Sequence, residues 1–203
     1  LPLDAGLVAY YKMDEGTGAT LRDTSGMGNH GTLLGAPAWG SGVRGLAQSF
    51  NGTSHYDEVP GAPSLDITNA ITMAAWIKCE QTVNTTQRIL AKTIMRQGTT
   101  TTGIDGYELS LSSAGKVFVR FNQQTNSDVI RLNSNTSYPL NGSAWMHVAA
   151  TYDGTNIKIY INGTLDATGA NQTFTIATNT LPVVLGRQND AASYFYYKGQ
   201  LDE

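Results

Sequence analysis

The sequence predicts an all-β protein in which two sheets pack face to face as a sandwich. Apolar and polar residues alternate with a period of two along most of the chain, and no segment keeps a helical period for three turns. Turn signals rich in glycine and asparagine recur at short, regular intervals. These features favour a sandwich over a parallel α/β sheet. A chain of 203 residues is also long enough to bury one sizeable core as a single domain.

The strands are expected in order along the chain. Strands outside the hairpins are expected at 7–13, 71–79, 181–185 and 196–201, and 71–79 alternates clearly. Within 71–79, Ile71 and Met73 fall on one face and Trp76 on the other, because neighbouring residues of a strand point to opposite faces.

Hairpins are expected where glycine-containing turns separate two such segments. Segment 47–59 reads as two short strands around Asn51-Gly52, a pair that favours a tight hairpin turn. The other expected hairpins join 107–111 to 116–121 and 145–152 to 157–161, the latter closed by a turn at Asn162-Gly163. At least nine strands result.

Composition excludes several classes of partner. Charged residues make up 14% of the chain, the formal net charge is −3, and the thirteen lysines and arginines are scattered along the sequence. This distribution argues against binding to nucleic acid or to anionic membranes. No apolar run approaches the ~20 residues that span a bilayer, so membrane insertion is not expected. The single cysteine, Cys79, cannot form an internal disulfide.

An ordered set of motifs is distinctive. In chain order they are GLVAYYKMDEGTG, DTSGMGNHGT, FNGTSHYDEVPGAPSLDI, ITMAAWIK, WMHVAATYDGTNIKIYINGTL and GQLDE. Together they resemble bacterial laminin G-like, concanavalin A-like jelly-roll domains, over 7–203. The resemblance implies an antiparallel jelly-roll of two curved sheets with six or seven strands each.

The same resemblance implies a setting. Such domains occur beside carbohydrate-active enzymes and in surface proteins, so a secreted or cell-surface location is expected. In that family the terminal Leu-Asp-Glu motif runs on into a last strand that pairs near the N-terminal one. We therefore expect residues 1–203 to be one domain excised from a larger protein, whose other parts could include a carbohydrate-active enzyme.

A calcium ion is expected at the rim of the sandwich. The turn between Asp23 and Thr32 offers carboxylate and carbonyl oxygens, the ligands that Ca²⁺ prefers. By resemblance, its ligands would come from Asp23, Asn29, Thr53 and Asp202. The alternative is that Asp23 and Asn29 only form Asx-turn hydrogen bonds with their own backbone.

Catalysis is not expected of this domain. Related sandwich-fold glucanases carry alternating acidic residues on one strand, so that two carboxylates share a face. The acidic pairs here are adjacent and would point to opposite faces of a strand: Asp14-Glu15, Asp57-Glu58 and Asp202-Glu203. The three histidines lack the spacing of a catalytic zinc site.

A glycan is the expected partner, because aromatic faces and planar polar groups are the side chains that hold sugars. The candidate residues are Trp76, Tyr160, Arg187, Asp190, Tyr194 and Tyr196. The alternative for each aromatic residue is packing in the core or at a sheet edge. Three functional hypotheses therefore remain. The first is a non-catalytic carbohydrate-binding module, and the second is a structural or protein-interaction domain whose only ligand is Ca²⁺. The third, a polysaccharide-cleaving enzyme, is disfavoured.

Overall fold

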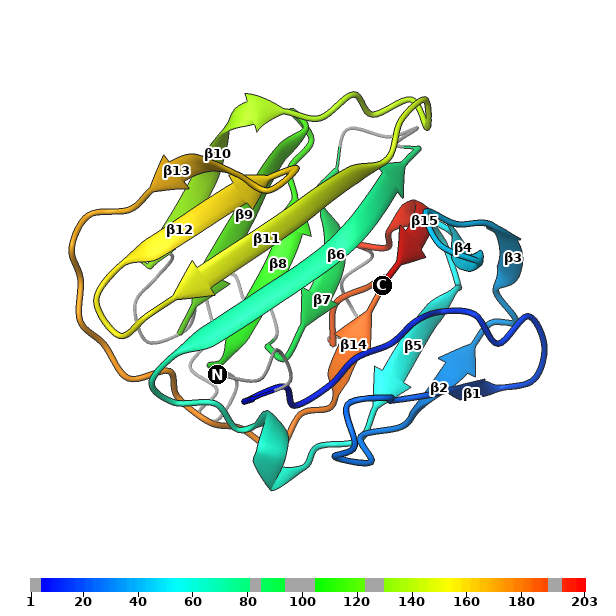
Figure 1. The fold of residues 1–203 in the computed structure, drawn as a ribbon, viewed down its shortest axis with the longest axis horizontal. Helices are drawn as coiled ribbons and strands as arrows, with labels where there is room; N and C mark the ends of the chain where they lie inside the picture. The colour runs from blue at the N-terminus through cyan, green and yellow to red at the C-terminus, as the bar shows by residue number, and fades with distance from the viewer. Residues whose placement is uncertain (1–4, 81–84, 94–104, 123–129, 190–194) are drawn as a thin grey trace.

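The computed structural model describes residues 5–80, 85–93, 105–122, 130–189 and 195–203. Within them the chain forms two antiparallel sheets that pack face to face (Figure 1). The eight-stranded sheet has the order β1 (Thr20–Leu21), β2 (Gly31–Leu34), β5 (Tyr56–Val59), β14 (Val183–Leu185), β7 (Gln87–Ala91), β8 (Tyr107–Leu111), β9 (Lys116–Phe121) and β10 (Arg131–Ser137).

The seven-stranded sheet lies in front of it in Figure 1. Its order is β13 (Thr164–Thr168), β12 (Ile157–Ile161), β11 (Met146–Tyr152), β6 (Ile71–Cys79), β15 (Lys198–Asp202), β4 (Leu46–Asn51) and β3 (Ala38–Ser41). One 3₁₀ turn, Pro63–Leu65, is the sole helical element of the described residues. The predicted all-β, two-sheet jelly-roll sandwich is confirmed.

The core lies between the two sheets and is built from the alternation that the sequence shows. In β6, Ile71, Met73 and Ile77 are buried, whereas Trp76 on the opposite face is only half-buried. From the facing sheet, Leu109 and Val119 meet the same apolar cluster. Each such side chain contributes roughly 1.5–3 kcal/mol when it is fully buried, so the shared interior is what holds the sheets together.

Two of the expected hairpins are confirmed. Strands β8 and β9 pair in register, with Tyr107 opposite Phe121 and Leu111 opposite Val117. Strands β11 and β12 also pair, and the Asn162-Gly163 turn then leads into β13. Asn162 and Gly163 both have positive φ angles, 50° and 79°, as a two-residue hairpin turn of this hand requires.

The hairpin expected across Asn51-Gly52 is wrong. Strand β4 pairs with β3 and β15, whereas β5 pairs with β2 and β14 in the other sheet. The Asn51 side chain explains the difference, because its Oδ1 accepts hydrogen bonds from three successive backbone N–H groups, those of Thr53, Ser54 and His55. This wider turn carries the chain from one sheet to the other.

The strand expected over 7–13 is also wrong in its extent. Only Tyr11 forms a bridge, to Asp23. The Tyr10 N–H donates to the Asp23 side chain instead of to a neighbouring strand, and Met13 has a φ of 53°, outside the range of extended backbone. The eight-stranded sheet exceeds the six or seven strands expected, since short strands such as β1 and β14 add to it.

Candidate functional site

The described residues predicted to bind a glycan divide between two faces of the sandwich. Trp76 and Tyr160 alternate with buried residues of β6 and β12, so they lie on the outer face of the seven-stranded sheet. Arg187 follows β14, and Tyr196 precedes β15; both lie by the outer face of the eight-stranded sheet, next to Tyr56. Asp190 and Tyr194 lie outside the described residues. Of the four predicted residues that the structure describes, it brings together only Arg187 and Tyr196.

Trp76 packs against a neighbouring strand. Its ring centroid lies 5.3 Å from that of His147, the residue opposite it on β11. Partial burial lowers the pKa of His147, so the neutral imidazole is favoured beside the indole. Tyr160 lies two strands away and borders a cavity of about 950 Å³ whose lining also includes Leu7 and Met73. Packing within the protein, the alternative reading for these aromatics, fits Trp76, although β6 is an interior strand of its sheet and not an edge.

The geometry around Arg187 is more specific. Its guanidinium carbon lies 3.7 Å from the centre of the Tyr56 ring, and its Nη1 lies 3.5 Å from the Tyr196 hydroxyl oxygen. The Tyr56 and Tyr196 rings meet edge to face at 6.4 Å. All three side chains are half-buried. We call Tyr56, Arg187 and Tyr196 the arginine–tyrosine site.

Local backbone structure fixes this site. Tyr56 points outward because Asp57, the next residue of β5, points into the interior and is fully buried. Gly186 has a φ of 80°, and a Cβ there would lie 2.5 Å from the Phe50 ring. Its carbonyl oxygen accepts a hydrogen bond from the Tyr197 N–H at 2.7 Å. This bond holds the segments that carry Arg187 and Tyr196 side by side.

A buried ionic cluster lies on the same outer face. Glu108 of β8 binds Arg88 of β7, with Nε–Oε2 at 3.2 Å, and Arg120 of β9, with Nε–Oε1 at 2.6 Å. Both arginines lie near the Phe118 ring, at 5.8 and 5.1 Å. The three charged side chains are 0–6% exposed. Because these side chains are buried and bound to one another, they support the face from beneath and do not contact a ligand. We call Arg88, Glu108 and Arg120 the ionic floor.

Further cations and rings surround this floor. Phe195 covers Arg88, with 4.9 Å from the guanidinium carbon to the ring centre, and its carbonyl oxygen accepts a hydrogen bond from the Arg88 N–H. Arg131 lies 3.9 Å from the Phe118 ring. The chain has seven arginines, and four of them, Arg88, Arg120, Arg131 and Arg187, are gathered on this face.

Sequence reasoning missed most of this arrangement. The lysines and arginines appear scattered along the chain, yet strand pairing sets Glu108, Arg120 and Arg131 opposite one another on three adjacent strands. Alternation within β8 and β9 carried a signal for two of them, because Glu108 and Arg120 alternate with inward apolar residues. Tyr56 gave no such signal: its partner Arg187 lies far away in the sequence.

The residues predicted to bind calcium do not share one set of contacts. Asp23 and Asn29 meet directly, since the Asn29 N–H donates to Asp23 Oδ2 at 2.8 Å. Asp23 Oδ1 accepts from the N–H groups of Tyr10 and Ser25. These are the turn-forming bonds of the alternative reading. Thr53 donates its N–H to Asn51 in the turn after β4.

Asp202 lies in a different setting. It is fully buried, and its Oδ2 accepts from the N–H groups of Val43 and Arg44, at 2.6 and 3.1 Å. Its Oδ1 is buried without a hydrogen-bond partner among the described residues. Burial raises the pKa of Asp202, and the nearby carboxylate of Asp14 adds to the rise. Asp14 accepts from the Leu46 N–H, so the two carboxylates hold the same loop.

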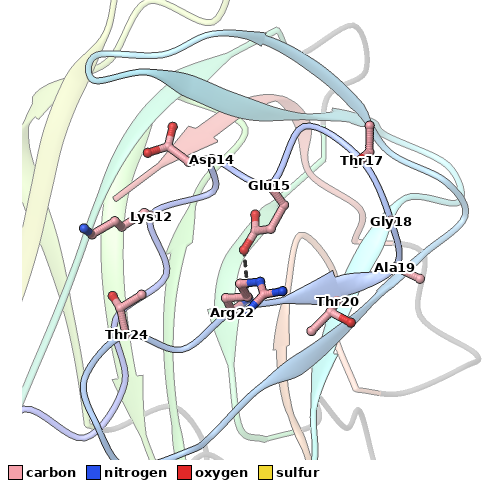
Figure 2. A pocket seen from close by; sticks show the side chains of 9 residues that line it. All are labelled: Lys12, Asp14, Glu15, Thr17, Gly18, Ala19, Thr20, Arg22 and Thr24. Carbon is pink, nitrogen blue, oxygen red and sulfur yellow. Dashed lines mark hydrogen bonds between the residues drawn. The ribbon is translucent and has the colours of Figure 1, made fainter.

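Residues within 12–24 line a pocket of about 460 Å³. Figure 2 shows Lys12, Glu15 and Arg22 around it, with the hydrogen bond from the Arg22 N–H to Glu15 Oε1, at 2.8 Å. Glu15 Oε2 is buried and has no partner in the described part of the chain. Across those same ranges, no group of three or more histidine, cysteine, aspartate or glutamate residues is arranged to hold a metal ion by itself.

Membrane insertion was also excluded from the sequence. Over the described ranges, no helix is long and apolar enough to cross a bilayer.

Comparison with known structures places the fold. The binding domain of Paraclostridial Mosquitocidal Protein 1 is 15% identical, with a TM-score of 0.75, covering 98% of this chain and 48% of that one. Domain 4 of AbnA, a GH43 extracellular arabinanase from Geobacillus stearothermophilus solved with arabinotriose, is 22% identical, with a TM-score of 0.68, covering 96% and 88%.

A third similar structure comes from botulinum neurotoxin type C, whose cell entry depends on two ganglioside molecules. It is 15% identical, with a TM-score of 0.68, and the match covers 98% of this chain and 48% of the toxin chain. This chain thus spans about half the length of the toxin chains that it matches. At these identities the likeness establishes the fold.

A search of curated proteins finds no match. A family model does match, over residues 51–203, and its description is the concanavalin A-like lectin/glucanases superfamily. That span covers most of the chain and includes β5 to β15. The resemblance seen in the sequence motifs is thereby confirmed, and the chain belongs to the concanavalin A-like lectin/glucanases superfamily.

Proposed function

We propose that this chain is a non-catalytic glycan-binding module, and that the sugar binds at the arginine–tyrosine site. The observation that carries the proposal is the fixed, half-buried set of two tyrosine rings and one guanidinium on the outer face of a rigid sheet. Aromatic faces pack against the C–H surfaces of sugars, and a guanidinium donates hydrogen bonds to their oxygens. Because these side chains already contact each other, little side-chain entropy is lost on binding.

The similar structures support this choice of partner. One of them is an arabinanase domain in complex with arabinotriose, and another belongs to a toxin that depends on gangliosides. The non-catalytic part of the proposal rests on Glu108, the acidic side chain at the centre of this face. It is fully buried and bound to two arginines, and a carboxylate held in that way is poorly placed to act on a substrate. A secreted or surface location is part of the same proposal.

Retention on polysaccharides tests the function. The protein would be run through native gels containing arabinan, xylan, galactan or polygalacturonate, with serum albumin as a non-binding control. We expect retardation in at least one gel, and no release of reducing ends from that polysaccharide. Reducing-end release would instead identify an enzyme. No retardation in any gel or on a broad glycan array would favour the structural or protein-interaction alternative.

We also propose a structural Ca²⁺ ion, at Asp202 rather than Asp23. The fit is better at Asp202, because its Oδ1 is buried without a partner among the described residues, whereas both Asp23 oxygens accept hydrogen bonds. Asp14, which raises the pKa of Asp202, is the second carboxylate nearby. A bound cation would supply positive charge that offsets the cost of burying Asp202.

Thermal unfolding tests the calcium proposal. We expect the melting temperature to rise on adding Ca²⁺ to EDTA-treated protein, since a ligand at about 100 times its Kd stabilises the folded state by about 2.7 kcal/mol. Asp202→Asn should abolish most of this rise, and Asp23→Asn should leave it while lowering the baseline stability. Equal melting of the wild type in EDTA and in excess Ca²⁺ would refute the proposal.

A further inference from the structure

The guanidinium of Arg187 is held so that one of its edges has no partner. The Tyr56 ring covers one flat face at 3.7 Å, and Nη1 is directed at the Tyr196 hydroxyl at 3.5 Å. Nε, on the opposite edge, is buried and has no hydrogen-bond partner among the described residues. A buried donor left unpaired costs free energy, so this edge is better satisfied with an acceptor than without one.

The unpaired edge has a definite chemistry. In a guanidinium, the Nε–H and one Nη2–H point the same way, and this pair matches the two oxygens of a carboxylate. The stacking of Arg187 on Tyr56 and its contact with Tyr196 set the direction of that edge. A single hydroxyl oxygen of a neutral sugar would satisfy only one of the two N–H groups.

The charge of the surrounding face favours an anion. Four of the chain's seven arginines lie on it, and Glu108 is buried between two of them, Arg88 and Arg120. The whole chain, by contrast, has a formal net charge of −3. Because the side chains of Arg88, Glu108 and Arg120 are almost fully buried, their charges are screened less than they would be in water.

From these observations we infer that the arginine–tyrosine site recognises a sugar ring that carries a carboxylate, with Arg187 as the residue that binds the carboxylate. The inference rests on the proposed glycan-binding function and narrows its ligand class. Two sources offer this chemistry: uronate-containing polysaccharides and sialylated oligosaccharides. In either, the sugar ring would pack beside Tyr56 and Tyr196, and its carboxylate would reach the Nε–Nη2 edge by displacing the atoms that now bury Nε.

The test compares ligands that differ only in the carboxylate. Binding would be measured by titration calorimetry with oligogalacturonate and its methyl ester, with 3′-sialyllactose and its methyl ester, and with lactose, which lacks the sialic acid altogether. We expect the acid form of at least one pair to bind roughly tenfold or more tightly than its neutral counterpart, as expected for charge-assisted hydrogen bonds. We also expect this preference to shrink as NaCl is raised to about 0.5 M. Which pair shows it identifies the source.

Variants assign the effect to Arg187. Arg187→Gln should abolish the preference for the acid form, and Arg187→Lys, which keeps the charge but not the paired N–H groups, should recover only part of it. Tyr196→Phe, which removes the hydroxyl near Nη1, should weaken it less. Arg44→Gln is the matched control, because Arg44 is an exposed arginine in the loop after β3 of the other sheet. Melting curves of each variant establish that it folds.

The outcomes separate the inference from the proposed function. Equal binding of the acid and neutral forms, or a preference that survives in Arg187→Gln, would overturn the inference and leave glycan binding standing. If the only sugars bound were neutral ones, lactose or arabinan, the inference would likewise be overturned and glycan binding would stand. If no carbohydrate bound, either in this titration or on the gels, both the inference and the proposed glycan-binding function would be overturned.

Discussion

Asp57 is a carboxyl group enclosed between the two sheets. It is fully buried, and its Oδ1 accepts a hydrogen bond from Gln48 Nε2 at 2.6 Å. Asp57 Oδ2 and Gln48 Oε1 both lack partners in the described structure, and a proton on Asp57 would let Oδ2 act as a donor. Burial raises the pKa of Asp57 from 3.8 to about 8, against the opposing effect of the Gln48 hydrogen bond.

This raised pKa makes stability depend on pH. The folded state keeps the Asp57 proton to about pH 8, whereas an unfolded chain releases it near pH 3.8. The stabilisation is therefore complete below pH 3.8 and is lost as the pH rises through about 8. We expect the melting temperature to fall between about pH 5 and about pH 9, and Asp57→Asn to flatten that fall. Glu58→Gln, at the residue next to Asp57 but on the outer face, should leave the fall in melting temperature unchanged.

The sequence predicted part of this at the residue scale. Adjacent acidic residues were expected to point to opposite faces, and Asp57 and Glu58 do so. Which of the two would point inward depends on Gln48, and Gln48 belongs to a strand of the other sheet. Alternation within one strand carries no information about that partner. The same limit hid Tyr56, whose role depends on Arg187.

Strands and turns were predicted well wherever the interactions are local. The bounds expected for 71–79, 107–111 and 116–121 are those of β6, β8 and β9. The error at Asn51-Gly52 arose because the Asn51 side chain bonds the backbone of the turn itself. Composition alone does not distinguish that turn from the hairpin turn at Asn162-Gly163.

Two turn glycines allow a matched test at the element scale. Gly115, between β8 and β9, has a φ of 74°, and a Cβ there would lie 2.3 Å from the Tyr138 carbonyl oxygen. Gly163 has a φ of 79° and open space around the same position. Gly163→Ala should cost only about 1 kcal/mol for the left-handed backbone. Gly115→Ala should cost more, roughly 2–4 kcal/mol, because the backbone must shift as well.

Urea unfolding at fixed pH measures both costs. Gly26, which has a positive φ and nothing within 4 Å of its Cβ position, provides a third variant, Gly26→Ala, that should resemble Gly163→Ala. Equal destabilisation by Gly115→Ala and Gly163→Ala would show that the close approach of Tyr138 does not constrain the β8–β9 turn.

At the scale of the whole molecule, the assignment of strands to sheets could not be read from the chain. Strand β14 lies between β5 and β7, and β15 lies between β4 and β6, so each sheet joins segments from both ends of the sequence (Figure 1). The motif order predicted the fold through resemblance. The gathering of arginines on one face emerged only from the strand order, and the proposed function depends on that face.

The most direct test of the central claim is to map where a retained oligosaccharide binds. Backbone amide signals of ¹⁵N-labelled protein would be followed during titration with the oligosaccharide. The Tyr196→Ala variant, which is expected not to bind, would be titrated in the same way as a reference. We expect saturable shifts centred on Tyr56, Arg187 and Tyr196, and their loss in the variant. Shifts centred on Trp76 and Tyr160, across the sandwich, would show that the binding face is the other sheet and would contradict this account.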